Sequence, residues 1–325
     1  MGRKSLEYAL PSMSPTTDSV IEVLKRRRAG ERDDGYRVAV ALEGGGLRGV
    51  VSGAMLIALH DLGFADHVDV YYGTSSGSIN VTYFAAGGSW NALSVYYDHL
   101  TNGFVPRLPL VSRLDMDLLD RVMRFQVPLD VTALRRSTRD TRIVLTNVKD
   151  VRPEIVPIRN VDDPVSYLIA GSWLPLLAGR PVELKGRDYL DGGLLYADPT
   201  LAALDESCSH ILAVNTTGEV AETHHSRRLR VAMKVLLNDW HRGLGDGYFN
   251  ARREWDVLRE HLSSNRSVRV NGSIVTRIRP APGSHQVKRL TMDRALLLDG
   301  ARVGYATIFS AFGEPQDDLY FSVTA

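Results

Sequence analysis

The sequence predicts an α/β fold with a mostly parallel central sheet flanked by helices. Residues 37–42 form a short β-branched run typical of a buried strand, and a helical pattern over residues 48–62 follows a run of glycines. Residues 68–72 are again strand-like and lead through Gly73 into a helical pattern that ends near residue 86. Two successive strand–helix units, each joined by a tight glycine turn, favour a parallel sheet.

The rest of the chain continues this pattern in one domain. Further strands are expected at 141–148, 188–191, 210–215 and 267–279, and further helices at 161–172, 227–262 and 292–312. We expect an N-terminal tail over residues 1–36, partly helical at 19–28, and a catalytic domain over residues 37–325. The irregular segment at about 90–139 is expected to act as a cap, and its apolar residues could equally line a pocket or belong to the core.

Composition narrows the class of protein. The chain has 325 residues, of which 44% are apolar and 24% charged, and its formal net charge is +1. Such a balance gives no global attraction to nucleic acid or to an anionic surface. One cysteine, Cys208, cannot form an internal disulfide, which fits a reducing compartment. Residues 1–17 lack the apolar run of a signal peptide, and the apolar stretch 167–178 is too short to span a bilayer, so we expect a cytoplasmic protein.

The first motif that carries chemistry is a glycine-rich loop, Gly44–Gly49, which follows a strand and opens a helix. Free N–H groups at a helix start bind anions. The loop therefore suits either a bound phosphate or an oxyanion hole for acyl transfer.

A dinucleotide site is one alternative, because Gly44, Gly46 and Gly49 have the spacing of that fingerprint. Asp66 and Asp69 lie roughly where a ribose-binding acid would be expected. Alone this match is weak.

The second motif explains more of the sequence. Gly73–Gly77 reads G-x-S-x-G, the pattern of a nucleophile elbow, and lies between an expected strand and an expected helix. Gly73 and Gly77 permit a sharp turn that raises the central Ser75 hydroxyl. A plain glycine–serine turn is the simpler interpretation, but the strand, the helix and the preceding glycine loop favour a nucleophile.

A serine nucleophile needs a base. None of the nine histidines lies in an evident catalytic motif, so a Ser-His-Asp triad is not indicated. The alternative is a carboxylate. Asp191 stands before two glycines, a pattern that by itself usually marks a turn.

These residues together resemble the patatin-like phospholipase family. The G-G-G-x-R-G loop at 44–49, the G-x-S-x-G elbow at 73–77 and the D-G-G block at 191–193 occur in the family's order. Residues 167–182 are similar to the family's segment before the aspartate block, and the resemblance extends over roughly residues 38–199.

The resemblance implies a fold related to the catalytic domain of cytosolic phospholipase A2. It also implies that Ser75 forms an acyl-enzyme and that Asp191 is the general base. By the same resemblance, amides of the glycine loop at Gly44, Gly45 and Gly46 form the oxyanion hole. Arg48 would support that loop or bind a lipid phosphate, unless it simply pairs with a carboxylate. By the same resemblance no metal or cofactor is expected, and the substrate would be a phospholipid or another long-chain ester met at a membrane surface. The family often has asparagine near residues 196–198, where this chain has Tyr-Ala-Asp.

Two other functions remain open at this stage. The same dyad could transfer an acyl group to a hydroxyl or amine of a biosynthetic intermediate. A binding module that holds a nucleotide or phosphate on the glycine loop would leave the elbow and Asp191 unexplained. The oligomeric state cannot be inferred from the sequence.

Overall fold

A single mixed sheet organises the chain. The computed structural model describes residues 18–106, 113–218, 227–262, 267–284 and 287–315. Its strands are β1 (Val38–Leu42), β2 (Val70–Thr74), β3 (Asp140–Asn147), β4 (Arg152–Pro157), β5 (Val182–Leu184), β6 (Arg187–Asp191), β7 (His210–Val214), β8 (Ser267–Val270) and β9 (Ser273–Ile278).

The centre of the sheet is parallel and its margins are antiparallel. Eight of the nine strands follow the order β5-β6-β3-β2-β1-β7-β9-β8, and the ninth, β4, pairs with β3 off this path. Strands β3, β2, β1, β7 and β9 run parallel to their neighbours in that series, whereas β4, β6, β5 and β8 pair antiparallel. The predicted α/β class with a mostly parallel sheet is confirmed.

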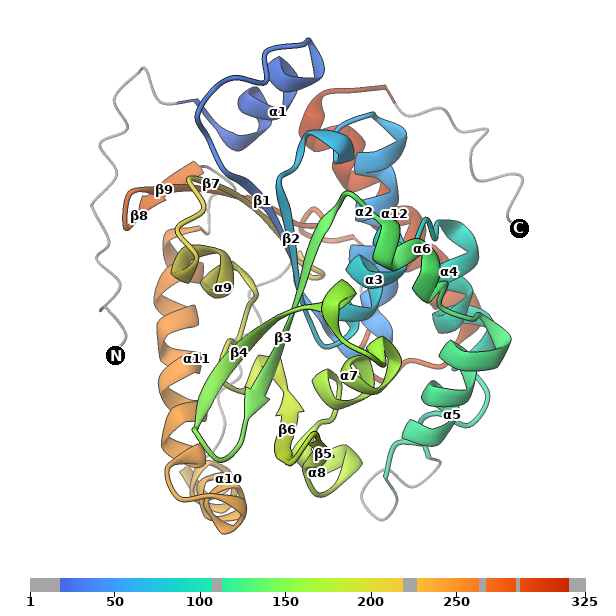
Figure 1. Ribbon diagram of the computed structural model, residues 1–325, viewed down its shortest axis with the longest axis vertical. Coiled ribbons are helices and arrows are strands. Elements are labelled where there is room, and N and C mark those ends of the chain that lie inside the picture. The colour runs from blue at the N-terminus through green and yellow to red at the C-terminus, as the bar shows by residue number, and fades with distance from the viewer. Residues whose placement is uncertain (1–17, 107–112, 219–226, 263–266, 285–286, 316–325) are drawn as a thin grey trace.

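Helices cover both faces of this sheet (Figure 1). They are α1 (Val20–Arg28), α2 (Gly49–Asp61), α3 (Ser76–Ala85), α4 (Trp90–Ser94), α5 (Met116–Arg121), α6 (Val131–Arg136), α7 (Pro164–Gly171), α8 (Pro175–Ala178), α9 (Thr200–Asp205), α10 (Arg227–Trp240), α11 (Leu244–His261) and α12 (Arg294–Phe312). Short 3₁₀ turns η1 (Gly46–Arg48), η2 (Ala65–His67), η5 (Ile158–Asn160) and η6 (Gly192–Leu194), and π-helical turns η3 (Val95–His99) and η4 (Val122–Gln126), complete the elements.

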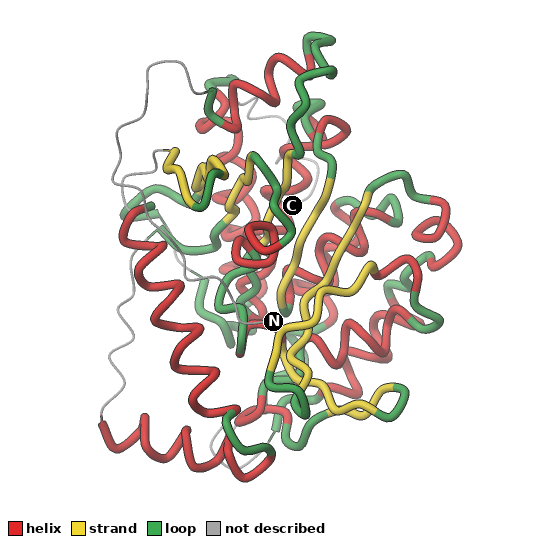
Figure 2. Tube along the Cα trace, turned by 60° about the vertical axis from the view of Figure 1, so that its left-hand side comes forward, coloured by secondary structure: helices red, strands yellow, loops and turns green. Residues whose placement is uncertain are grey.

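Alternation along the strands separates two apolar cores. In β1, Val38, Val40 and Leu42 pack into the core shared with α2, α3 and α12, whereas Ala39 and Ala41 face the core shared with α9 and α11. Figure 2 shows α11 running beside the sheet, with α10 crossing its lower end. The result is a three-layer arrangement in which both sheet faces are buried.

The expected N-terminal tail contains a helix that packs against the domain. Val20, Val23 and Leu24 of α1 are fully buried, and the Ser19 hydroxyl accepts a hydrogen bond from the Glu22 amide as its cap. Near the end of this helix the Arg27 guanidinium is buried and paired with Asp34 and Asp69, so its charge stabilises the fold. Residues 18–28 thus belong to the core, while residues 1–17 lie outside the described part.

The sequence predicted one strand where the structure has two. Residues 267–279 form the hairpin β8–β9, which turns at Asn271 and Gly272, both with positive φ. Asn-Gly is a strong hairpin signal, and the prediction of one strand overlooked the turn that it marks. Strands β4 and β5, at the antiparallel margin, were not predicted either.

None of the described helices combines the length and the apolar character that crossing a bilayer requires.

Candidate active site

Ser75 occupies the turn between strand β2 and helix α3. Its backbone has φ 53° and ψ −131°, a conformation that costs free energy for any residue other than glycine. The predicted strand–turn–helix context of the elbow is therefore present, with the serine at its strained position.

The two glycines of the elbow are required by close backbone approach. A Cβ atom on Gly73 would lie 2.5 Å from the carbonyl oxygen of Gly77, and one on Gly77 would lie 2.3 Å from the carbonyl oxygen of Leu42. The turn folds back on itself and presses against the end of β1, so any larger residue at either position would displace it.

Asp191 ends strand β6 and is held from both sides. Its amide donates to the carbonyl of Trp173 (3.1 Å), and its own carbonyl accepts from the Thr146 hydroxyl (2.9 Å). The side chain is buried, and Oδ1 accepts a hydrogen bond from the Gly193 amide at 2.7 Å. The second of the two glycines after the aspartate thus supplies the amide that orients the carboxylate.

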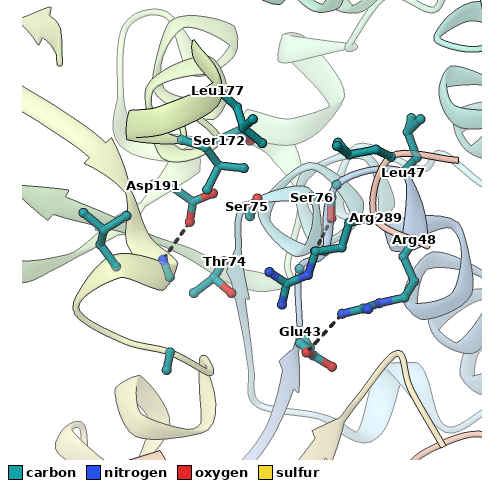
Figure 3. A pocket seen from close by; sticks show the side chains of 18 of the residues that line it. Glu43, Leu47, Arg48, Thr74, Ser75, Ser76, Ser172, Leu177, Asp191 and Arg289 are labelled. Carbon is teal, nitrogen blue, oxygen red and sulfur yellow. Dashed lines mark hydrogen bonds and ion pairs between the residues drawn. The ribbon is translucent and has the colours of Figure 1, made fainter. Parts of the chain in front are cut away.

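Strand register brings Ser75 and Asp191 level with each other. Thr74 pairs with Val144 of β3, and Asp191 pairs with the next residue, Leu145, on the same side of that strand, because β4 pairs with both residues from the opposite side. Strands β2 and β6 therefore meet end to end along one side of β3, and Ser75, one residue beyond Thr74, lies beside Asp191. Figure 3 shows the second carboxylate oxygen of Asp191 directed toward Ser75.

The electrostatic state of Asp191 reflects its burial. Burial raises the pKa of the carboxyl, and hydrogen bonding with the Ser75 hydroxyl and the Gly193 amide opposes part of the rise. Within the described residues, Oδ2 is buried without a hydrogen bond of ordinary geometry. The Ser75 hydroxyl therefore lies near this oxygen but outside the geometry of an ordinary hydrogen bond.

No histidine competes with Asp191 in the described part of the chain. The side chains that line the cavity beside Ser75 include none. His224, His225 and His285 lie outside the described residues.

The glycine loop lies against the elbow. The Gly45 amide donates to Ser76 Oγ (2.9 Å), and the Leu47 amide donates to the carbonyl of Arg289 (2.9 Å). Gly46 has φ 60°. The hydrogen bonds between described residues include none from the amides of Gly44 or Gly46. Of the three expected oxyanion-hole amides, that of Gly45 is thus occupied by Ser76.

Arg48 is paired inside the protein. Its Nε donates to the Thr216 hydroxyl (2.8 Å), and its guanidinium lies 3.7 Å from Glu43. Glu43 also accepts from the Thr216 amide at 2.8 Å. This arrangement favours support of the glycine loop over contact with a lipid phosphate, the two roles that the sequence left open.

A cavity of about 420 Å³ adjoins Ser75 and Asp191. The expected cap segment contributes six of its lining residues: Tyr96, Leu100, Phe104, Leu114, Met116 and Leu119. Val122 and Met123 of the same segment are fully buried in the core instead. The segment therefore supplies both an apolar cavity wall and ordinary core.

Several polar residues of the cavity region escaped the sequence analysis. Asp198 is buried, accepts from the Thr200 amide (2.8 Å) and from the Asn215 side chain (2.7 Å), and burial raises its pKa to about 6. Asn215 in turn accepts from Arg277 Nε at 2.5 Å. A charged residue inside an otherwise apolar strand, such as Arg277 in β9, was the available signal.

The described residues contain no group of three or more His, Cys, Asp or Glu side chains placed to hold a metal ion.

The comparison with protein families agrees with these motifs. The patatin-like phospholipase family matches residues 40–204, which hold the glycine loop, the elbow and Asp191. The chain belongs to the patatin-like phospholipase family, as the resemblance in the sequence indicated.

Similar proteins extend this assignment in sequence and in fold. The uncharacterized protein YjjU of Escherichia coli K12 is 27% identical over 188 residues, which are 55% of this chain and 52% of YjjU. This chain therefore spans about half the length of that relative. In structure it is similar to human GIVD cytosolic phospholipase A2, solved with methyl γ-linolenyl fluorophosphonate, with a TM-score of 0.51, 14% identity and coverage of 90% of this chain and 60% of that one. It is also similar to VipD from Legionella pneumophila, with a TM-score of 0.50, 12% identity and coverage of 85% and 66%. At these identities the structures establish a shared fold.

Proposed function

We propose that this protein is a lipid acyl hydrolase that cleaves phospholipid or other long-chain ester bonds with Ser75 and Asp191 as its catalytic dyad. The observation that carries the proposal is the placement of a buried carboxylate opposite a serine on a strained elbow, beside a cavity with an apolar wall. Membership of the patatin-like phospholipase family supports the lipid substrate.

The chemistry follows from the groups present. The Ser75 oxygen attacks the ester carbonyl while Asp191 takes the proton of the Ser75 hydroxyl. Asp191 then returns this proton to the alcohol as it leaves. Water, activated by the same carboxylate, then attacks the acyl-enzyme, and the acid departs as Ser75 is restored. Amides of the glycine loop stabilise the negative charge that develops on the carbonyl oxygen. Because burial raises the pKa of Asp191, its carboxylate is a better base than an exposed one.

Contact with a lipid surface is part of the proposal. Met233 and Leu237 of helix α10 line the cavity, while Val231 and Val235 of the same helix are 56% and 65% exposed. The two valines lie on the side of α10 turned away from the cavity, where exposed apolar side chains suit peripheral contact with a bilayer.

The test is hydrolysis of a fatty-acyl ester by purified wild type, Ser75→Ala and Asp191→Asn, with fluorophosphonate labelling of each. We expect each substitution to abolish turnover, and labelling to disappear in Ser75→Ala. Full activity of either variant would contradict the proposed dyad. Analysis of the products with candidate alcohol acceptors present would reveal acyl transfer, the alternative raised by the sequence.

A further inference from the structure

The cavity beside Ser75 has a second wall that is rich in arginine. Arg252 and Arg259 from helix α11, Arg277 from strand β9 and Arg289 from the segment before α12 all line it. We call these four residues the arginine cluster. The apolar wall from the cap segment suits an acyl chain. The arginine-rich wall would then face the polar part of the substrate.

Helix α11 presents one polar face to the cavity. Arg252, Trp255, Asp256 and Arg259 all line it, and their spacing of i, i+3, i+4 and i+7 places them on one side of the helix. Arg259 pairs with Asp256 at 2.9 Å. The exposed neighbour Arg253 does not line the cavity.

Arg277 is the deepest member of the cluster. It is 3% exposed, and its Nε donates to Asn215. Within the described residues its NH1 is buried without a hydrogen-bond partner. Burial of a guanidinium with an unmade hydrogen bond costs free energy that a bound anion would recover.

Arg252, which lies nearer to Ser75 and Asp191, also has a buried nitrogen without a hydrogen-bond partner among the described residues. One of its nitrogens donates to the carbonyl of Gly193 at 3.4 Å, whereas its Nε is buried with no partner among the described residues. Arg252 and Arg289 both lower the pKa of Asp191 by their charge, which places them close to the reacting groups. Figure 3 shows the Arg289 guanidinium extending toward Ser75 and Thr74.

The cluster gives the cavity a local excess of positive charge. The acids that line it are Glu43, Asp191 and Asp256, and the first of these is paired with Arg48. The arginines outnumber the acids although the whole chain has a net charge of only +1. In a partly buried site, where salt screens poorly, such an excess selects anions.

We propose that the arginine cluster binds the phosphate of the substrate and that its excess positive charge repels the cationic group of a zwitterionic headgroup, so that the enzyme prefers phospholipids with a net negative headgroup. Guanidinium groups match phosphate geometry with paired N–H donors, and Arg252 and Arg277 each have a buried nitrogen without a partner among the described residues. Arg48 contributes little to this subsite because Thr216 and the largely buried Glu43 hold it, whereas the Asp256 side chain that pairs with Arg259 is 58% exposed. The inference rests on the proposed lipid hydrolase function and names its substrate class.

The first experiment compares soluble substrates. Dihexanoyl phosphatidylglycerol and dihexanoyl phosphatidylcholine, both below their micelle concentrations, have the same acyl chains and remove the effect of surface charge. We expect wild type to favour the anionic lipid in kcat/KM by roughly tenfold or more, the effect of one charge-assisted hydrogen bond. Arg277→Gln and Arg259→Gln should bring that ratio close to one, and Arg277→Lys should restore part of it.

Arg253→Gln is the matched control, since it removes the same charge from the same helix outside the cavity. It should keep the wild-type ratio. If Arg277→Gln fails to fold, the partly exposed Arg259 still decides the outcome. A wild-type ratio near one, or an equal drop in Arg253→Gln, would overturn the proposed subsite.

Binding separates this inference from the proposed function. If wild type hydrolyses neither lipid, the hydrolase proposal fails, and calorimetry on Ser75→Ala still tests the cluster with dihexanoyl phosphatidylglycerol and with inorganic phosphate. Lipid binding that weakens at least roughly tenfold in Arg277→Gln would support the subsite. Absence of lipid binding, or inorganic phosphate binding as tight as the lipid, would refute its assignment to a lipid headgroup.

Discussion

The buried carboxyl of Asp198 and the buried guanidinium of Arg277 are joined through one side-chain amide, that of Asn215. The carboxylate accepts from the amide nitrogen, and the amide oxygen accepts from the guanidinium. This chain of hydrogen bonds fixes the orientation of Arg277 at the cavity wall and places a titratable acid behind it.

Asp198 should make stability depend on pH. Its pKa rises from 3.8 to about 6 on folding, so the folded state binds more protons than the unfolded state between those values. The free energy of unfolding should therefore fall as pH rises from about 4 to 6, by on the order of 1–3 kcal/mol.

Asp198→Asn should remove this fall and be more stable than wild type at pH 8. Urea unfolding across that pH range measures both quantities. Asp117→Asn, at an exposed carboxyl on α5, serves as the control and should follow wild type. An unchanged pH dependence in Asp198→Asn would show that this carboxyl is not the source.

Strain at the elbow predicts a stabilising substitution. Ser75→Gly and Ser75→Ala both delete the hydroxyl, but only glycine relaxes the strain of φ 53°. The relief of about 1–3 kcal/mol is partly offset by glycine's greater entropy in the unfolded state. We expect Ser75→Gly to be about 1 kcal/mol more stable than Ser75→Ala, with both inactive. Equal stabilities in thermal and urea unfolding would argue against a strained backbone.

Close approach at the elbow predicts the opposite effect for Gly77. A methyl group there would lie 2.3 Å from the Leu42 carbonyl oxygen, so Gly77→Ala should destabilise the fold by about 2 kcal/mol or more and displace Ser75. Gly171→Ala is the comparison, because its nearest atom would be 3.6 Å away. It should change the free energy of unfolding by less than about 1 kcal/mol. Similar costs for the two variants would contradict this account.

The sequence was sufficient for the motifs that are short and continuous. The elbow around Ser75 and the glycine loop could be named because neighbouring residues define them, and Asp191 could be named because its block follows those two motifs in the order typical of the family. The hairpin at Asn271 was not predicted because apolar and polar residues alternate on both sides of the Asn-Gly turn, and the alternation was interpreted as one continuous strand.

The arginine cluster could not be predicted in the same way. Arg252, Arg277 and Arg289 come from a helix, a strand and a connecting segment, and only tertiary packing brings them to one cavity. Even Arg277, an arginine inside a buried strand, indicated by itself no more than an internal ion pair.

The raised pKa of Asp191 links activity and stability in opposite directions. A general base must be ionised, so kcat/KM should rise with pH along a limb whose midpoint lies above the ordinary aspartate value of 3.8. Ionisation of a buried carboxyl also costs folding free energy at every pH above that midpoint, because the folded state holds the proton more tightly than the unfolded state. Asp191→Asn removes the charge and keeps an oxygen that can accept from the Gly193 amide. At neutral pH it should therefore be inactive yet at least as stable as wild type, as measured by urea unfolding beside the pH–rate profile. A destabilised Asp191→Asn would mean that the carboxylate charge holds the site together, and a limb at or below 3.8 would assign the essential base elsewhere.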